Sequence, residues 1–288
     1  MSGYKTFAVV GAGTIGGPVI SELLKLKATG TISSVSLITR SSTHPLSSSG
    51  VQILTVSYTD PSSLTRALSG IDVLISTVAT AGLVHQPALA QAAKEAGVKL
   101  FVPPEFGMPS DVDVPGVLGA KYRFKQELKK LGLPYTAICS GIFTGFIFNV
   151  PPFGWDVKNG KATIFGDGDA QNSWTDAPDV ARYVAHVLTH VPREKLEWQT
   201  LRIQGDLASM NDILTAYQTH TGTQLSVTRV STAELKARVD KNPADFAWLL
   251  LLYNEGYANV EKAGVMAMEL FPEWNPRKVV DVLAGMAG

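Results

Sequence analysis

Three glycines near the start of this sequence have the spacing that binding of a dinucleotide requires. Gly11, Gly13 and Gly16 follow a short β-branched and aromatic run at 6–10, and apolar residues at helical spacing follow over 19–26. Gly11 permits a tight turn, Gly13 lets the backbone approach a pyrophosphate, and Gly16 lets the helix pack against the strand. Because a helix start offers free N–H groups and a positive dipole end, we expect this turn to bind phosphates.

A single arginine indicates which dinucleotide would bind. Sites that prefer NAD usually place Asp or Glu at the end of the second strand, where it accepts from the ribose 2′-hydroxyl. Here the expected strand 35–40 ends at Arg40, and no acid occurs between Gly30 and Asp60. A guanidinium suits a 2′-phosphate through charge-assisted hydrogen bonds, so we expect NADP(H) rather than NAD(H). The alternative is that Arg40 is only an exposed arginine at a strand end.

A lysine lies within the apolar stripe of a later helix, expected over 117–131. Val117, Lys121, Phe124 and Leu128 are spaced so that they share one helix face. We therefore expect Lys121 to point toward the sheet, where burial would lower its pKa and suit it to donate or accept a proton. The alternative is a lysine whose stem packs while its ammonium reaches water. The other lysines of the helix are expected to be solvated; they are Lys125, Lys129 and Lys130.

Strands and helices alternate through the first half of the chain. This alternation predicts a doubly wound parallel α/β sheet of the Rossmann type, with ligands beyond the carboxyl ends of the strands. The expected strands are 6–10, 35–40, 51–56, 72–78, 100–103 and 135–143, and the expected helices are 19–26, 60–68, 84–96 and 117–131.

The pattern changes after Val150, where Pro151-Pro152 interrupts the chain. We expect an NADP-binding domain over 1–150 and a smaller α+β region over 151–288 that covers the substrate. The segment 177–204 is expected to return to the main sheet. Further helices are expected near 177–190, 209–220, 231–240 and 243–254, with a strand at 200–204.

Composition excludes several classes of partner. The 288 residues include 25 Lys+Arg and 25 Asp+Glu, a net charge of zero that favours neither nucleic acid nor an anionic membrane. Cys139 is the sole cysteine, so no intramolecular disulfide is possible. The first residues lack a signal pattern, and no apolar run is long enough to span a membrane. We expect a cytoplasmic location, and the oligomeric state is not readable.

Other catalytic patterns are incomplete. His186 and His190 are four residues apart, but no cysteine or acid cluster supports a metal site. The stretch from Gly154 to Lys161 has the wrong spacing for a P-loop, and no glycine elbow surrounds Ser140. We therefore expect no metal, and we exclude kinase and hydrolase chemistry. No tyrosine has Lys four residues later, so the usual Tyr-x-x-x-Lys pair of short-chain dehydrogenases is missing.

Several segments resemble the NmrA-like group of atypical short-chain dehydrogenases, above all its isoflavone reductase and phenylcoumaran benzylic ether reductase branch. They are the turn 11–17, the run 86–107, the stretch from Lys121 through Gly132-Leu133-Pro134-Tyr135-Thr136, and 174–183. In that family the catalytic lysine begins the helix that ends at this Pro-Tyr-Thr run, and Lys121 occupies its place. The resemblance implies reduction of a small, often aromatic, substrate by NADPH. The chain departs from the family pattern at Pro104, where Ser is common, and at Ser57, where an acid is common.

The expected site combines the turn with later strand ends. Pyrophosphate would lie over 11–16, Thr77 and Val78 would flank the ribose or nicotinamide, and Phe143 would pack on the ring or the substrate. Glu105 would line the pocket or pair with a lysine. Phe146 and Phe148 are expected in the core. The expected cofactor-binding residues are Gly11, Gly13, Thr14, Ile15, Gly16, Arg40, Thr77, Val78, Pro104, Glu105, Lys121, Ser140 and Phe143.

Three functions are compatible with such a site. The first is an NADPH-dependent reductase that transfers hydride to a small aromatic, enone or carbonyl substrate, with Lys121 as general acid or oxyanion stabiliser. The second is a non-catalytic, redox-sensing regulator that holds the cofactor and contacts a protein partner. The third is a non-redox isomerase or cyclase. The substrate would be selected by the region after Pro151, where aromatic residues either face it or pack in the core; they are Trp155, Phe246, Trp248, Tyr253 and Tyr257.

Overall fold

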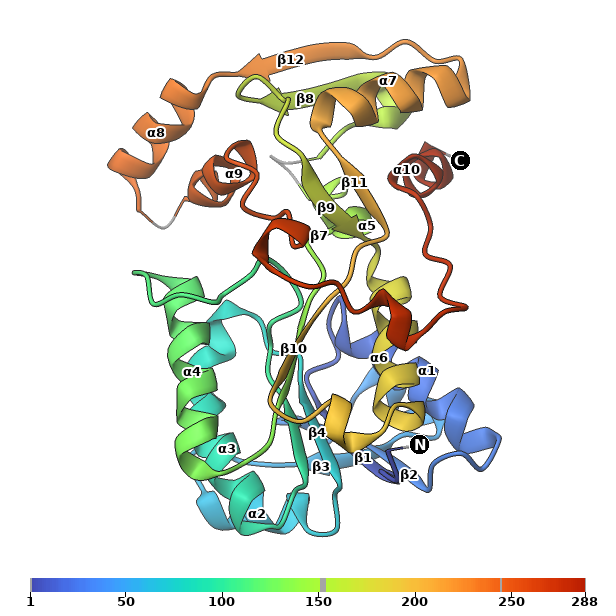
Figure 1. The fold of residues 1–288 in the computed structure, drawn as a ribbon, viewed down its shortest axis with the longest axis vertical. Helices are drawn as coiled ribbons and strands as arrows, with labels where there is room; N and C mark the ends of the chain where they lie inside the picture. The colour runs from blue at the N-terminus through green and yellow to red at the C-terminus, as the bar shows by residue number, and fades with distance from the viewer. Residues whose placement is uncertain (1, 151–153, 244, 288) are drawn as a thin grey trace.

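The computed structural model describes residues 2–150, 154–243 and 245–287. Its lower half in Figure 1 is built around a parallel sheet. A five-stranded sheet has the order β3-β2-β1-β4-β5, and every pair in it is parallel. A bridge between Phe101 and Tyr135 continues it to β6, which pairs in parallel with β10. The strands are β1 (Thr6–Val10), β2 (Ser34–Thr39), β3 (Gln52–Thr55), β4 (Val73–Ser76), β5 (Leu100–Val102), β6 (Thr136–Cys139) and β10 (Gln199–Arg202).

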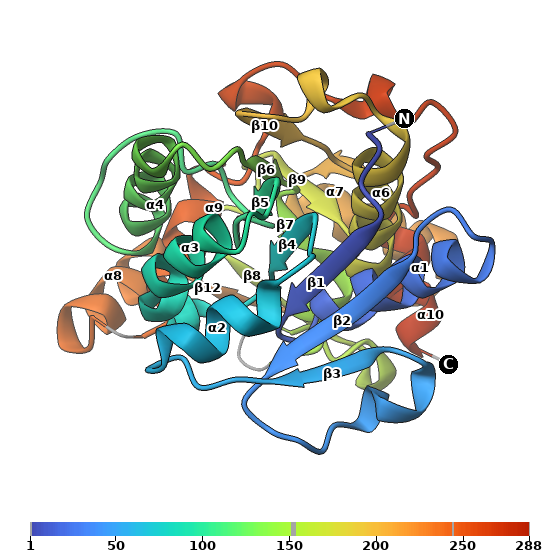
Figure 2. The same ribbon diagram turned by 90° about the horizontal axis from the view of Figure 1, so that it is seen from below.

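Helices cover both faces of this sheet (Figure 2). On one face α1 (Gly16–Ala28) packs against α6 (Ala177–His190). On the other face α2 (Pro61–Leu68), α3 (Gln86–Glu95) and α4 (Val117–Leu131) lie side by side. The doubly wound α/β fold predicted from the alternation is therefore confirmed.

Successive side chains of β1 point to opposite faces of the sheet and so contribute to two hydrophobic cores. Phe7 and Val9 belong to the cluster beneath α1 and α6, whereas Ala8 and Val10 belong to the cluster beneath α2, α3 and α4. All four side chains are fully buried. A strand covered on both faces must be apolar at every position, which explains the unbroken apolar run before the glycine turn.

The strand expected over 135–143 divides in two at Gly141. This glycine has φ +70°, and a side chain there would overlap the backbone of Ser173. The chain therefore leaves the main sheet after β6, and β7 (Ile142–Phe143) pairs with β9 (Asn172–Thr175) instead. Periodicity did not reveal this change of partner, because both halves are apolar.

The later region is built from two small sheets and several helices. One sheet has the order β11-β9-β7 and the other pairs β12 with β8 in parallel. Its helix α10 was not predicted. The elements are α5 (Thr144–Ile147), β8 (Lys161–Phe165), β11 (Asp206–Ala208), α7 (Met210–Thr221), β12 (Ser226–Val230), α8 (Thr232–Lys241), α9 (Ala247–Asn254) and α10 (Val279–Ala287), with short 3-10 turns η1 (Pro45–Ser49), η2 (Thr80–His85), η3 (Val157–Asn159), η4 (Arg193–Lys195), η5 (Glu261–Ala263) and η6 (Met268–Leu270).

The domain division at 150/151 stays a prediction, because Pro151 and Pro152 lie outside the described residues. Two elements of the later half, α6 and β10, lie on the main sheet, while β8, α7, α8 and α9 lie apart from it (Figure 1). Among the described residues no helix combines the length and the apolar character needed to cross a bilayer.

Candidate active site

The turn between β1 and α1 can be built only with glycine at two positions. Gly11 has φ +88°, a conformation that side chains disfavour. A Cβ on Gly16 would overlap the carbonyl oxygen of Gly11 and the hydroxyl of Thr77. A Cβ on Gly13, in contrast, would meet no atom within 4 Å. Gly13 therefore borders open space, as expected if a ligand approaches the backbone there.

The start of α1 is free to receive an anion. Its N-cap residue, Ile15, makes no side-chain capping bond, and the first turn holds no acid. Gly13 and Thr14 are exposed. Unpaired N–H groups and the helix dipole both favour phosphate at such an end. The residues present fit the pyrophosphate of a dinucleotide.

Thr77 supports this turn from the neighbouring strand. It directly follows β4, and its Oγ1 donates to the carbonyl oxygens of Val10 and Gly11, each at 3.0 Å. The hydroxyl expected to flank a ribose thus braces the glycine turn. Val78 is half-buried beside it and lies close against Gly82.

Arg40 directly follows β2 and is exposed. It forms no ion pair with a carboxylate in the part of the chain that the structure describes. Burial raises the pKa of Tyr58, and the positive charge of Arg40 nearby opposes that rise. Tyr58 stacks on His85 with ring centroids 4.7 Å apart. This aromatic pair near Arg40 was not singled out from the sequence, because Tyr58 follows β3 and His85 ends η2, and only folding brings them together.

Lys121 lies in the second turn of α4 and is half-buried. Its Nζ donates to the backbone carbonyl oxygen of Glu105, just beyond β5, at 2.7 Å. Burial lowers the pKa of Lys121, while the carboxylate of Glu105 raises it. The ammonium is thus held at a strand end rather than extended into water.

The expectation that Lys125 is solvated is wrong. Lys125 is only 3% exposed, and its Nζ lies 3.5 Å from Oε1 of Glu105. Its burial is possible because the charge is paired and the ammonium is hydrogen-bonded. Lys129 and Lys130 are exposed, as expected.

The remaining strand-end residues have different surroundings. Ser140, after β6, is fully buried, and its Oγ has no hydrogen-bond partner. Phe143 is half-buried and packs against the core on the α1 side of the sheet. Phe148 is in the core as expected, but Phe146 is 46% exposed, so the core prediction for it is wrong.

A pocket of about 220 Å³ opens beside Lys121. Its lining includes Pro103, Pro104 and Glu105 after β5, and Gln86 at the start of α3. Gln86 is 1% exposed, and neither its amide nitrogen nor its oxygen has a partner. A buried amide with both ends unpaired is costly, so this side chain is placed to meet a ligand or water. Sequence reasoning missed it, although a lone amide at a helix start after a strand end was a usable signal.

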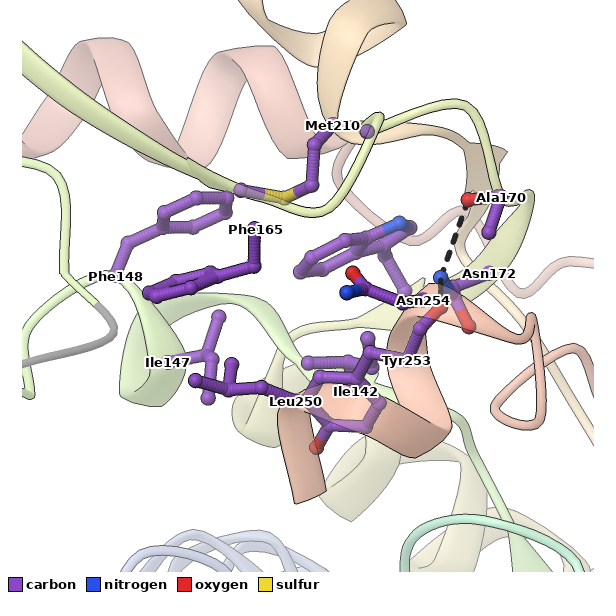
Figure 3. A pocket seen from close by; sticks show the side chains of 12 residues that line it. Ile142, Ile147, Phe148, Phe165, Ala170, Asn172, Met210, Leu250, Tyr253 and Asn254 are labelled. Carbon is purple, nitrogen blue, oxygen red and sulfur yellow. Dashed lines mark hydrogen bonds between the residues drawn. The ribbon is translucent and has the colours of Figure 1, made fainter. Parts of the chain in front are cut away.

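A second pocket, narrower at about 30 Å³, lies in the later region (Figure 3). Apolar side chains of β7, α5 and α9 surround it, and Phe148 and Phe165 border one side in the view. Of the five aromatic residues singled out after Pro151, Tyr253 lines this pocket, Trp155 is 3% exposed and Phe246 is 59% exposed. Trp248 and Tyr257 are partly buried and pack against the hydrophobic core of the later region.

The structure brings most of the expected site to one edge of the sheet. The glycine turn, Thr77, Glu105 and Ser140 lie at the carboxyl ends of β1, β4, β5 and β6. Phe143 lies beyond Gly141, on the small sheet. No cluster of His, Cys, Asp and Glu among the described residues could hold a metal ion.

A parallel sheet in this order, with a glycine-rich turn after its first strand, defines a Rossmann fold. The sequence model of the NmrA-like family matches residues 3–279, so this chain belongs to the NmrA-like family. The resemblance inferred from the motifs is thereby confirmed.

Relatives extend the comparison. The chain is 29% identical to the isoflavone reductase homolog IRL of Zea mays over 244 residues, 78% of this chain and 77% of that protein. A crystal structure of isoflavone reductase superposes with a TM-score of 0.80 at 20% identity, covering 98% of this chain and 99% of the other. The leucoanthocyanidin reductase–NADPH complex from Vitis vinifera superposes with a TM-score of 0.79 at 21% identity, with the same coverage of both chains. Structural likeness at this identity establishes the fold.

Replacement of Gln86 by Leu tests whether its amide serves to bind a ligand rather than to stabilise the fold. We expect the free energy of unfolding of the ligand-free protein to stay the same or rise, because a buried unpaired amide is removed. Urea denaturation measures this, with the exposed Gln91→Leu on the same helix as control. A loss of more than about 1 kcal/mol in Gln86→Leu alone would show that the amide supports the fold instead.

Proposed function

We propose that this protein is an NADP(H)-dependent reductase of a small aromatic, enone or carbonyl substrate. The observation that carries the proposal is the meeting of two features at one sheet edge. One is the glycine turn with its open space at Gly13, and the other is the half-buried ammonium of Lys121. A phosphate cradle alone would fit a binding protein, but a lysine held at the strand ends also supplies a proton donor.

We assign each part of the cofactor to residues of this chain. The free N–H groups of the turn 11–16 would hold the pyrophosphate. Arg40 would pair with the 2′-phosphate, because it is exposed and has no carboxylate partner among the described residues. Val78, Pro104 and Ser140 would border the nicotinamide end, where the unpaired hydroxyl of Ser140 offers a hydrogen bond. Phe143 would lie on the substrate side. When bound, the cofactor supplies the hydride.

Lys121 would act on the oxygen of the substrate. As hydride arrives at a carbon, negative charge develops on the conjugated oxygen, and an ammonium stabilises that charge or donates a proton to it. A lysine whose pKa is lowered by burial gives up its proton more readily than an exposed lysine.

The names of the similar proteins support a reductase. Isoflavone reductase homologs are among the relatives, and the structural neighbour from Vitis vinifera is a reductase solved with NADPH. The expected NADP-dependent oxidoreductase agrees with both. The substrate itself would be selected by the region after Pro151, which carries the apolar pocket of Figure 3.

The direct experiment is a screen for NADPH oxidation with aromatic aldehydes, enones and benzylic ethers. A reductase lowers the NADPH absorbance in step with loss of substrate. An isomerase or cyclase would consume substrate while the absorbance stays constant. A redox sensor would bind NADPH and leave every substrate unchanged.

Arg40→Ala tests the preference between cofactors. We expect affinity for NADPH to fall about 10- to 100-fold, since a charge-assisted hydrogen bond contributes about 1.5–3 kcal/mol. Affinity for NADH, which lacks the 2′-phosphate, should not change. Titration calorimetry measures both, with the exposed Arg66→Ala on α2 as control. Equal affinities of the wild type for NADPH and NADH would remove this assignment.

Lys121→Met tests the proton donor. We expect turnover to fall by about 10² to 10⁴, the usual contribution of a general acid, while NADPH still binds. In the wild type, kcat should fall as pH rises through the lowered pKa of Lys121, because only the ammonium form donates. Lys129→Met is the matched control on the exposed face. A Lys121→Met enzyme with full activity would contradict the role.

A further inference from the structure

A buried ion pair lies one helical turn from Lys121 and has no place in the function so far. Lys125 and Glu105 are each 3% exposed, and their charged atoms are 3.5 Å apart. A buried pair of this kind adds little stability compared with apolar residues of the same volume, because both ions lose their hydration. Its presence beside the candidate proton donor therefore calls for another explanation.

Ser110 joins the two charges. Its Oγ donates to Oε2 of Glu105 at 2.7 Å and accepts from Nζ of Lys125 at 2.7 Å. Nζ of Lys125 also donates to the carbonyl oxygen of Ser110 at 3.0 Å. Ser110 is 1% exposed, so the whole arrangement is shielded from water. Each oxygen of the Glu105 carboxylate thus has a partner, Ser110 at Oε2 and the ammonium of Lys125 near Oε1. The same ammonium lies 4.0 Å from Oδ1 of Asp111.

Glu105 connects this arrangement to Lys121 through its own backbone. Its side chain pairs with Lys125, while its carbonyl oxygen accepts from Nζ of Lys121 at 2.7 Å. The backbone here is tightly turned, since N–H of Glu105 donates to the carbonyl of Pro103 at 2.8 Å. The next residue, Phe106, has φ +32°, which is rare for a residue other than glycine and needs support from its surroundings.

We propose that Lys125 is a positioning residue: with Ser110 it clamps the side chain of Glu105, so that the carbonyl oxygen of Glu105 holds the ammonium of Lys121 at the pocket. This proposal depends on the proposed function in one respect only, which is that it takes Lys121 to be the proton donor. Through this arrangement the charges of Glu105 and Lys125 also influence whether Lys121 is protonated.

Several charged groups face Lys121, and the sign of each effect follows from the charge of the group. Burial lowers the pKa of Lys121, the carboxylate of Glu105 raises it, and the ammonium of Lys125 lowers it. From β6, burial raises the pKa of the Cys139 thiol to about 12, which keeps it neutral. Arg123 and Glu127 of α4 line the same pocket with opposite charges. Within the clamp, the two partners therefore act on Lys121 in opposite directions.

The test measures the pKa of Lys121 directly, by competitive acetylation across pH with mass spectrometry, in cofactor-free protein. Lys125→Met removes a neighbouring cation and leaves the carboxylate of Glu105 unbalanced, so the pKa of Lys121 should rise by about one unit or more. The nearly isosteric Glu105→Gln should lower it. Lys125→Met/Glu105→Gln should lie between the two, and the exposed Lys129→Met should match the wild type. Opposite charges near Lys121 give opposite shifts whether or not the clamp exists, so Ser110→Ala tests the clamp itself. It removes a hydrogen bond to Glu105 but no charge, and the pKa of Lys121 should fall as the carbonyl of Glu105 is released.

Shifts of the same sign in Lys125→Met and Glu105→Gln, no shift in either, or an unchanged pKa of Lys121 in Ser110→Ala would overturn the proposal. Should Lys125→Met fail to fold, Glu105→Gln and Ser110→Ala decide, and an unchanged or raised pKa of Lys121 in either contradicts the clamp. The outcome is separate from that of the reductase: opposite shifts together with a fully active Lys121→Met would keep the clamp and remove the catalytic role. For an active enzyme, the pH at which kcat falls should move in the same directions.

Discussion

The close approach of α1 to the carbonyl of Gly11 is the contact on which the rest of the site depends. It exists because Gly16 has no side chain, and it is held by the hydroxyl of Thr77 from the next strand. If α1 moved away from the sheet, its free N–H groups would no longer border the space at Gly13. The hydroxyl of Thr77, which follows β4, also donates to the carbonyl oxygen of Val10 at the end of β1, so the ends of these two paired strands stay together.

A second constraint acts on the opposite side of that edge. There the segment after β5 is held by a buried ion pair and Ser110, and the backbone it fixes receives Lys121. One side of the site thus presents uncharged N–H groups at the start of α1, and the other presents the ammonium of Lys121. In the proposed reductase these two groups would have separate tasks, so the burial that lowers the pKa of Lys121 would not disturb the phosphate side.

The sequence was sufficient where neighbouring residues carry the information. Local spacing was enough to predict the glycine turn, the position of Arg40 at a strand end and the place of Lys121 on the apolar face of its helix. The burial of Lys125 could not be predicted, because it depends on Glu105 and Ser110, which approach only after folding. For the same reason the change of sheet at Gly141 could not be predicted, because it depends on pairing with β9. Long-range partners, rather than local propensities, decided each of these cases.

The most direct measurement is calorimetric titration of Gly13→Ala with NADPH, alongside its unfolding in urea. Since a Cβ at Gly13 meets no protein atom within 4 Å, the free protein should keep its stability. The same methyl group would occupy the space into which the pyrophosphate must come, so binding of NADPH should be lost. Gly13→Ala protein that binds NADPH as tightly as the wild type would contradict the account.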